Sequence, residues 1–138
     1  MRAHTGRQNM RDFLSSFVLI SLVLLLSGCF AANPIQLYQI DSGRTIEMAP
    51  GSVLKIVLDS NPTTGYQWEA LPWHTAVIEQ VGKPAYKPRS EAIGSGGELT
   101  FHFKALSKGQ TQLEFIYHRS FEKGVPPIKS FKVTLVVS

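Results

Sequence analysis

The side chains able to do covalent or metal chemistry are few and scattered along this chain of 138 residues. There is one cysteine, Cys29, and there are four histidines, of which His74, His102 and His118 fall on different predicted elements. A zinc site needs several such ligands at close spacing. No serine, histidine and carboxylate can be placed together as a catalytic set. The sequence therefore predicts no metal site, no cofactor and no enzymatic activity.

The most distinctive local chemistry belongs to the hexapeptide Asn61–Tyr66, which reads Asn-Pro-Thr-Thr-Gly-Tyr. Pro62 fixes its own φ and holds the preceding residue extended. Thr63 and Thr64 are β-branched and therefore stiff, and Gly65 can adopt the positive φ that closes a turn. Because an ordinary turn needs only one such residue, two interpretations follow. The segment is either a strand connection with favourable turn residues or a fixed shape presented to another molecule.

Alternating apolar residues predict that the hexapeptide joins two strands of an all-β domain. From Val53 to Asp59 the apolar side chains alternate as in a half-buried strand, and Trp68 is expected to pack in the core. Similar patterns predict strands over residues 37–40, 44–48, 77–81, 99–104, 111–118 and 130–137. Residues 71–88 contain three prolines, which favours an edge strand and an irregular connection. About seven or eight short strands without helices favour an antiparallel, immunoglobulin-like β-sandwich.

The N-terminal segment is typical of an exported lipoprotein. Arg7 and Arg11 precede an apolar run, Phe13–Leu26, which is shorter than a transmembrane helix and followed by small residues. The sequence Leu26-Ser27-Gly28-Cys29 resembles the bacterial lipobox, in which the cysteine is lipidated and becomes the new N-terminus. We therefore expect a lipoprotein signal peptide over residues 1–28, a lipidated tether over 29–34 and a folded domain over 35–138.

The expected processing also changes the charge of the chain. From Cys29 onward, eleven Lys and Arg stand against nine Asp and Glu, so the formal charge falls from +4 to +2. The basic residues are spread along the chain, which argues against nucleic-acid binding. By resemblance to lipoproteins of envelope-bearing bacteria, Phe30 in place of an aspartate implies attachment to the outer membrane, facing the periplasm. We expect the protein to be monomeric and to contact the membrane through its lipid.

Three connections are expected at one end of the sandwich if successive strands alternate in direction. They contain the hexapeptide, then Gly94-Ser95-Gly96-Gly97, then Tyr117-His118-Arg119-Ser120-Phe121-Glu122. In this order and spacing the three segments resemble the chagasin-type inhibitors of papain-like cysteine proteases, over nearly all of the expected domain. The third segment departs from the family pattern, which usually has Arg-Pro-Trp where this chain has Arg-Ser-Phe.

The resemblance implies that the three loops form a wedge in the protease cleft and block it reversibly, without a covalent bond. Thr63 would then lie closest to the catalytic cysteine. A stiff turn can fill the cleft while keeping its carbonyl groups out of attack alignment, and it loses little entropy on binding. The residues that the resemblance places at the protease are Asn61, Pro62, Thr63, Thr64, Gly65, Tyr66, Gly94, Gly96, Gly97, Arg119 and Phe121.

The roles of the second and third segments stay open at the level of sequence. Gly94, Gly96 and Gly97 either let the backbone pair with an enzyme strand or give a flexible loop. Phe121 replaces the family's tryptophan, with less contact area and no indole donor. Arg119 either anchors its own loop or contacts the enzyme. The alternative function is an envelope lipoprotein whose immunoglobulin-like domain binds or supports another protein without inhibiting it.

Overall fold

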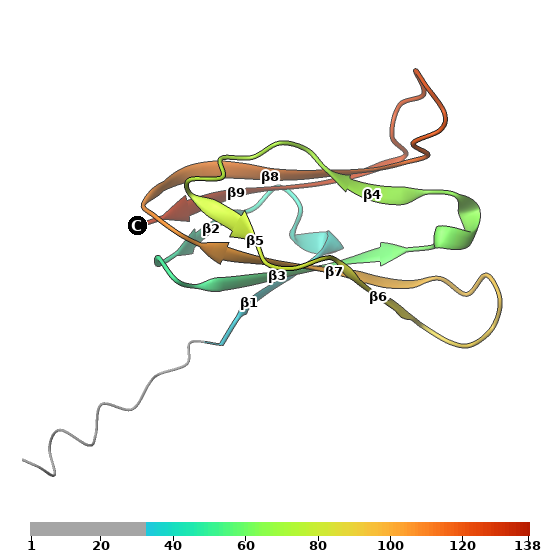
Figure 1. The fold of residues 1–138 in the computed structure, drawn as a ribbon, viewed down its shortest axis with the longest axis horizontal. Coiled ribbons are helices and arrows are strands. Elements are labelled where there is room, and N and C mark those ends of the chain that lie inside the picture. Colours follow the sequence, from blue (N-terminus) through green and yellow to red (C-terminus); the bar gives the residue numbers. More distant parts are fainter. Residues whose placement is uncertain (1–32) are drawn as a thin grey trace, which may run out of the picture. The chain divides into compact units, whose positions relative to one another are not determined.

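The computed structural model describes residues 33–138. The strands in this part of the chain pair into two sheets (Figure 1). The expected signal peptide and Cys29 lie outside the described residues. Within that part of the chain, no helix is long and apolar enough to span a membrane. The strands are β1 (Ile35–Tyr38), β2 (Thr45–Met48), β3 (Val53–Ser60), β4 (Gln67–Ala70), β5 (Ile78–Gln80), β6 (Ala85–Pro88), β7 (Gly97–Ala105), β8 (Gly109–His118) and β9 (Lys129–Val137).

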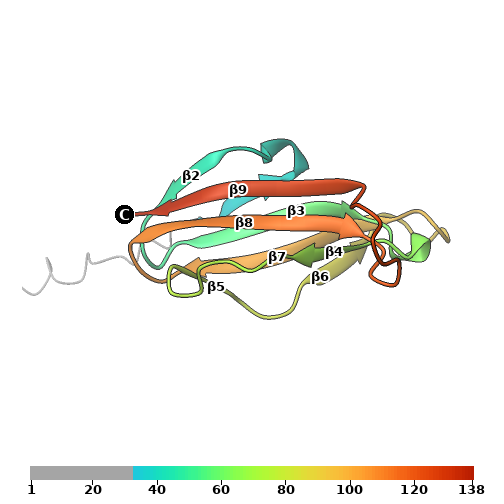
Figure 2. The same cartoon turned by 90° about the horizontal axis from the view of Figure 1, so that it is seen from above.

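The two sheets face each other as the layers of a sandwich. One has the strand order β1-β3-β7-β5, with β6 also paired to β7, and the other has the order β2-β9-β8-β4. Figure 2 shows the same layers from above. Strands β1 and β3 are parallel, as are β2 and β9, whereas all other described pairs are antiparallel. The prediction of an all-β, immunoglobulin-like sandwich is confirmed, with two parallel pairs at its edges.

The core fills the space between the sheets with the apolar side chains that alternation predicts. The ring of Phe115 lies between those of Phe101 and Phe131, at centroid distances of 4.6 and 6.1 Å. Trp68 is also buried, as expected. The largest fully buried side chains are Phe103, Phe115, Phe131, Leu54, Ile56, Leu58, Ile78, Leu113, Leu135 and Val133. Because close-packed side chains of both sheets interdigitate here, the strand ends that carry the loops are held on a rigid support.

Two elements differ from the sequence-based expectation. The first strand ends at Tyr38 and is followed by the 3-10 helix η1 (Gln39–Asp41). There the Tyr38 backbone N–H donates to the Asp41 carboxylate, and Arg44 also donates to it, at 2.8 and 2.6 Å. These two hydrogen bonds lower the pKa of Asp41. The second difference is β6, a strand that the sequence did not predict because prolines surround it. It pairs with β7 and with no other described strand.

Candidate functional site

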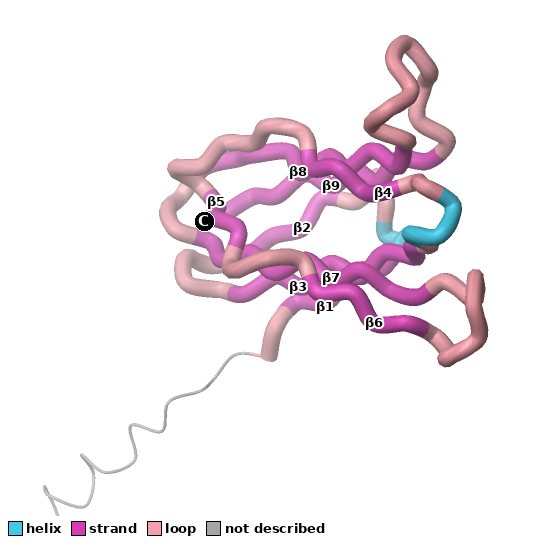
Figure 3. Tube along the Cα trace, turned by 45° about the vertical axis from the view of Figure 1, so that its right-hand side comes forward, coloured by secondary structure: helices cyan, strands magenta, loops and turns pink. Residues whose placement is uncertain are grey.

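Three loops meet at one end of the sandwich, as the sequence predicted (Figures 1 and 3). Ser60 at the end of β3 pairs with Gly97 at the start of β7, and Gln67 at the start of β4 pairs with His118 at the end of β8. We call the connections at this end the first loop (residues 61–66), the second loop (89–96) and the third loop (119–128). The strand register therefore places the three predicted segments beside one another.

The first loop is a short turn stiffened by its own side chains. Pro62, Thr63 and Thr64 form the 3-10 helix η2 (Pro62–Thr64), and Gly65 ends it with φ of 80°. The Asn61 side-chain oxygen accepts from the Thr63 backbone N–H at 3.3 Å and from the Thr63 hydroxyl at 2.6 Å. The Asn61 carbonyl accepts from the Thr64 hydroxyl at 2.6 Å. The stiffness expected from these residue types is therefore reinforced by hydrogen bonds of both threonines to one asparagine.

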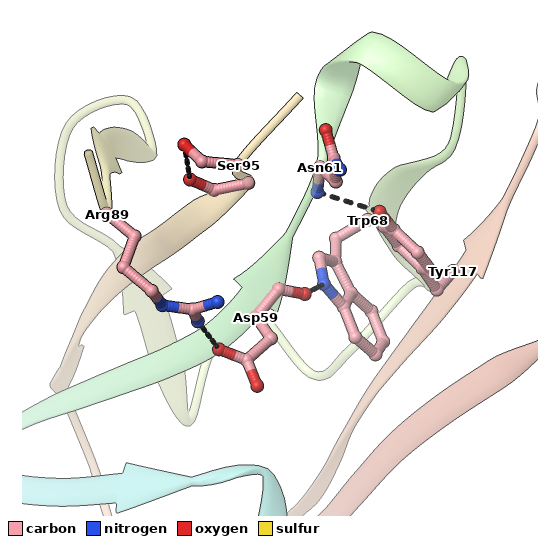
Figure 4. A network of polar contacts seen from close by, with 7 residues as sticks. Asp59, Asn61, Trp68, Arg89, Ser95 and Tyr117 are labelled. Atoms are coloured by element: carbon pink, nitrogen blue, oxygen red, sulfur yellow. Dashed lines mark hydrogen bonds and ion pairs between the residues drawn. The ribbon is translucent and has the colours of Figure 1, made fainter. Parts of the chain in front are cut away.

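Polar contacts join the first loop, and the strand that leads into it, to the second loop; Figure 4 shows those of Asp59 with Arg89 and Trp68. The Asn61 side-chain amide donates to the Gly94 carbonyl at 3.0 Å. Below it, Arg89 at the start of the second loop forms an ion pair with Asp59 of β3 at 2.8 Å. The indole N–H of Trp68 donates to the Asp59 carbonyl at 2.9 Å. The strand that enters the first loop is thus tied to the strand that leaves it and to the second loop.

Arg119 ties the third loop to the first. Its Nε donates to the Thr64 carbonyl at 3.1 Å, and its guanidinium carbon lies 4.4 Å from the centre of the Tyr66 ring. Its Nη1 is 2.9 Å from the Glu122 carboxylate. The hydrogen bond with Glu122 raises the pKa of Arg119, whose guanidinium is charged at physiological pH in any case. Of the two roles considered for Arg119, the structure shows the anchoring one.

Phe121 packs against the glycine that ends the first turn. A Cβ atom built on Gly65 would lie 3.2 Å from Cε1 of Phe121, closer than an ordinary van der Waals contact. Gly65 is therefore required for its positive φ, and a side chain there would also push the exposed phenyl ring aside by a few tenths of an ångström. Phe121 as a whole is nevertheless 69% exposed. An exposed aromatic ring held beside the turn is available to a partner protein.

The three glycines of the second segment have different surroundings. Gly94 is exposed, has φ of 81°, and has open space around it. Gly96 and Gly97 are buried. A Cβ atom on Gly97 would lie 2.2 Å from the Lys87 carbonyl oxygen of β6. Gly97 also sits between β3 and β6 in the sheet. Because Gly97 has no side chain, β6 can approach it closely. Gly94 is the glycine that a partner can reach.

The structure adds exposed apolar side chains that sequence reasoning missed. Ile93, at the tip of the second loop, is 101% exposed, and Val125 in the third loop is 52% exposed. The signal in the sequence was an isoleucine within an otherwise small and polar segment. Together with Phe121 these side chains flank the first loop on both sides. Exposed apolar groups around a polar apex are typical of a protein-binding surface.

The loops at this end of the described domain have the features of a binding surface. Among residues 33–138, no three His, Cys, Asp or Glu side chains gather as a metal site. His118 pairs with Glu69 at 2.6 Å, at the base of the third loop. The first loop has a fixed shape and is linked to both neighbours. The arrangement can therefore present a preformed convex surface to a concave partner.

The chain is similar in sequence to two known proteins and in fold to a solved structure. Amoebiasin-2 of Entamoeba histolytica is 29% identical over 119 residues, which is 86% of this chain and 96% of the relative. Chagasin of Trypanosoma cruzi is 30% identical over 84 residues, which is 56% of this chain and 74% of chagasin. A crystal structure of a cysteine protease inhibitor from Entamoeba histolytica superposes with a TM-score of 0.68 and 25% identity, covering 75% of this chain and 95% of that one.

The family comparison spans the part of the chain that carries all three loops. The model of the chagasin family of peptidase inhibitors matches residues 47–135. Because this is a family of inhibitors, the match confirms the prediction that the protein is not an enzyme. It also confirms the family resemblance that the three loop segments suggested. The chain therefore belongs to the chagasin family of peptidase inhibitors.

Proposed function

We propose that the protein is a reversible, non-covalent inhibitor of papain-like cysteine proteases and that its three loops fill the active-site cleft. The proposal rests on the hydrogen bonds that hold the first loop. Asn61 donates one to the second loop, and Arg119 of the third loop donates one to the Thr64 carbonyl. Family membership and the similarity to the cysteine protease inhibitor of Entamoeba histolytica support the choice of target class. Because one copy carries all three loops, a monomer suffices.

The shape of the first loop explains how it would occupy a protease without being cut. Three of its carbonyl groups already accept internal hydrogen bonds: those of Asn61, Pro62 and Thr64. Cleavage requires a carbonyl aligned with the nucleophile and free to place its oxygen among the donors that stabilise the tetrahedral intermediate. A 3-10 turn held from both sides does not offer that alignment. The loop would therefore bind the cleft as an obstacle rather than as a substrate.

The test is an inhibition assay with protein that starts at residue 29 and carries Cys29→Ser to prevent lipidation. We expect papain or a cathepsin-like enzyme to lose activity at submicromolar inhibitor and to regain it on dilution. Mass spectrometry should find the inhibitor uncut after prolonged incubation. If micromolar protein leaves a panel of papain-like enzymes fully active, the alternative of a non-inhibitory binding module replaces this proposal.

Ile93 is expected to be an anchor of the complex. Replacing it with serine should raise the inhibition constant about tenfold, since burying an isoleucine at an interface is worth about 1.5 kcal/mol. The melting temperature should not change, because the side chain is fully exposed. Ile40 is the matched control, since it is 91% exposed but lies in η1, outside the three loops. Equal inhibition constants for Ile93→Ser and Ile40→Ser would exclude Ile93 from the interface.

We also propose that the protein is anchored by lipid at Cys29 to the outer membrane, facing the periplasm. The lipobox-like segment ending at Cys29 motivates this. In the described domain, Ile35 at the start of β1 pairs with Leu54, near the beginning of β3. The first loop follows Ser60, about 20 Å further along β3 at about 3.3 Å per residue. A tether entering there would leave the loops at the far end of the domain from the membrane.

Fractionation of cells tests the anchor. Wild-type protein should incorporate labelled fatty acid and sediment with outer-membrane vesicles. Cys29→Ser should lose the label and remain as unprocessed precursor or soluble protein, since the thiol that would carry the lipid is gone. Labelled Cys29→Ser protein would contradict the assignment of this residue, and sedimentation of wild type with inner membrane would contradict the outer-membrane location.

A further inference from the structure

We propose that Tyr117 is a positioning residue of the inhibitory surface, and that its buried hydroxyl holds the first loop in its binding shape. The inference rests on the proposed function, but it concerns a residue that is buried beneath the loops. Tyr117 lies near the end of β8 and is only 5% exposed. Any effect it has on inhibition must therefore pass through the residues that it contacts.

The hydroxyl of Tyr117 acts at the point where the strand ladder ends. Ser60 is the last residue of β3 and pairs with Gly97, so the next backbone N–H, that of Asn61, lies beyond the ladder. That N–H donates to the Tyr117 hydroxyl at 2.9 Å (Figure 4). A partly buried backbone donor needs such a partner. The tyrosine hydroxyl therefore holds Asn61, the first residue of the loop, which has no partner in the strand ladder.

Asn61 is also the residue from which the rest of the first loop is organised. Its side chain and carbonyl accept the hydrogen bonds of Thr63 and Thr64, and its amide donates to Gly94 of the second loop. A shift of the Asn61 backbone would move all three partners. One buried hydroxyl on β8 thus controls the position of the apex and its link to the second loop.

The ring of Tyr117 is itself fixed by a stack of aromatic side chains. The ring centroid of Trp68, which is buried in the core, lies 4.9 Å from that of Tyr117, and the centroid of Tyr66 lies 5.5 Å away. Tyr66 in turn carries the guanidinium of Arg119, which holds the Thr64 carbonyl. Tyr117 and Arg119 lie two residues apart at the end of β8. Tyr117 therefore holds the first loop at Asn61, and Arg119 holds it at Thr64.

Removing only the hydroxyl should loosen the loop while leaving the stack intact. In Tyr117→Phe, the Asn61 N–H loses its acceptor, and the loop is expected to sample other shapes. When only a fraction of molecules is competent to bind, the apparent affinity falls by that fraction. We expect the inhibition constant of papain to rise about tenfold, the factor equivalent to one lost hydrogen bond. The change should appear in the association rate, because Tyr117 forms no contact that dissociation would break.

Thr111→Val is the matched control. The Thr111 hydroxyl accepts from the His74 backbone N–H at 3.0 Å, so it makes the same kind of bond on the same strand, at the end away from the loops. Both variants should unfold within about 5 °C of the wild type, as expected for the loss of one hydrogen bond. Thr111→Val should inhibit papain like the wild type, whereas Tyr117→Phe should not.

Hydrogen exchange of the free protein tests the same claim without a protease. The Asn61 amide should be protected in the wild type and in Thr111→Val, and should exchange at least about tenfold faster in Tyr117→Phe. Unchanged protection at Asn61, or an association rate equal to that of the wild type, would overturn the positioning role. A wild type that fails to inhibit would instead overturn the proposed function, and the exchange result would still decide the role of Tyr117. If Tyr117→Phe did not fold, the hydroxyl would be a stability determinant and the proposal would fail.

Discussion

Replacing Thr63 with arginine is expected to abolish inhibition, raising the inhibition constant for papain at least about 100-fold, which corresponds to about 2.7 kcal/mol. Thr63 is exposed in the middle of η2, at the apex of the first loop. A long charged side chain there must either displace the loop from the cleft or lose its hydration on binding. The assay is a titration of papain activity together with a melting curve, which should change by no more than about 2 °C for a surface substitution.

Thr63→Ser is the control for this experiment. Serine keeps the hydroxyl that donates to the Asn61 side chain at 2.6 Å and adds no bulk. It should stay within about threefold of the wild type, as expected for the loss of one exposed methyl group. If Thr63→Arg inhibits as well as Thr63→Ser does, the first loop does not enter the cleft.

Gly97→Ala is expected to destabilise the domain although it adds only one methyl group. The new Cβ would lie 2.2 Å from the Lys87 carbonyl oxygen and 2.8 Å from the Pro88 Cα. Since both contacts are with backbone, β6 must move away from β7. Overpacking of this kind costs about 2 kcal/mol and should lower the melting temperature by about 10 °C.

Gly94→Ala is the matched comparison, because it adds the same methyl group in open space. Its cost comes only from the positive φ of 81° and should be about 1 kcal/mol. Denaturant unfolding of both variants measures the difference directly. Equal losses of stability would mean that β6 yields easily and that the close approach at Gly97 is not required.

The sequence could predict the sandwich because its core residues repeat with period two. Alternation from Val53 to Asp59 located β3 almost completely, and the buried residues of β7, β8 and β9 follow the same rule. β6 escaped prediction because prolines surround it and because all four of its residues are exposed, so no face of it is marked by a buried apolar row. The 3-10 helix η1 depends on the Asp41 contact with Tyr38, which leaves no periodic signal.

The candidate site was predictable in its parts but not in its connections. The residue types of the first loop indicated stiffness, and the alternation of strand direction placed the three segments together. The bonds that unite them join residues far apart in the chain, 56 positions for Asn61 and Tyr117 and 55 for Thr64 and Arg119. Such contacts depend on strand register, which periodicity alone does not specify. The resemblance placed Gly97 at the protease; the register adds its close approach to β6, and a contact of Gly97 with a partner stays a prediction.

The most direct test of the account is protection of the protease's catalytic cysteine from alkylation. Papain would be mixed with excess protein carrying Cys29→Ser, treated with iodoacetamide, and examined by mass spectrometry. Since the three loops are proposed to cover the cleft, labelling should slow at least about tenfold with wild-type loops and proceed normally with Thr63→Arg. The inhibitor itself should remain uncut. Labelling at the free rate in a complex that has nevertheless formed would show that the loops bind elsewhere on the enzyme and would contradict the account.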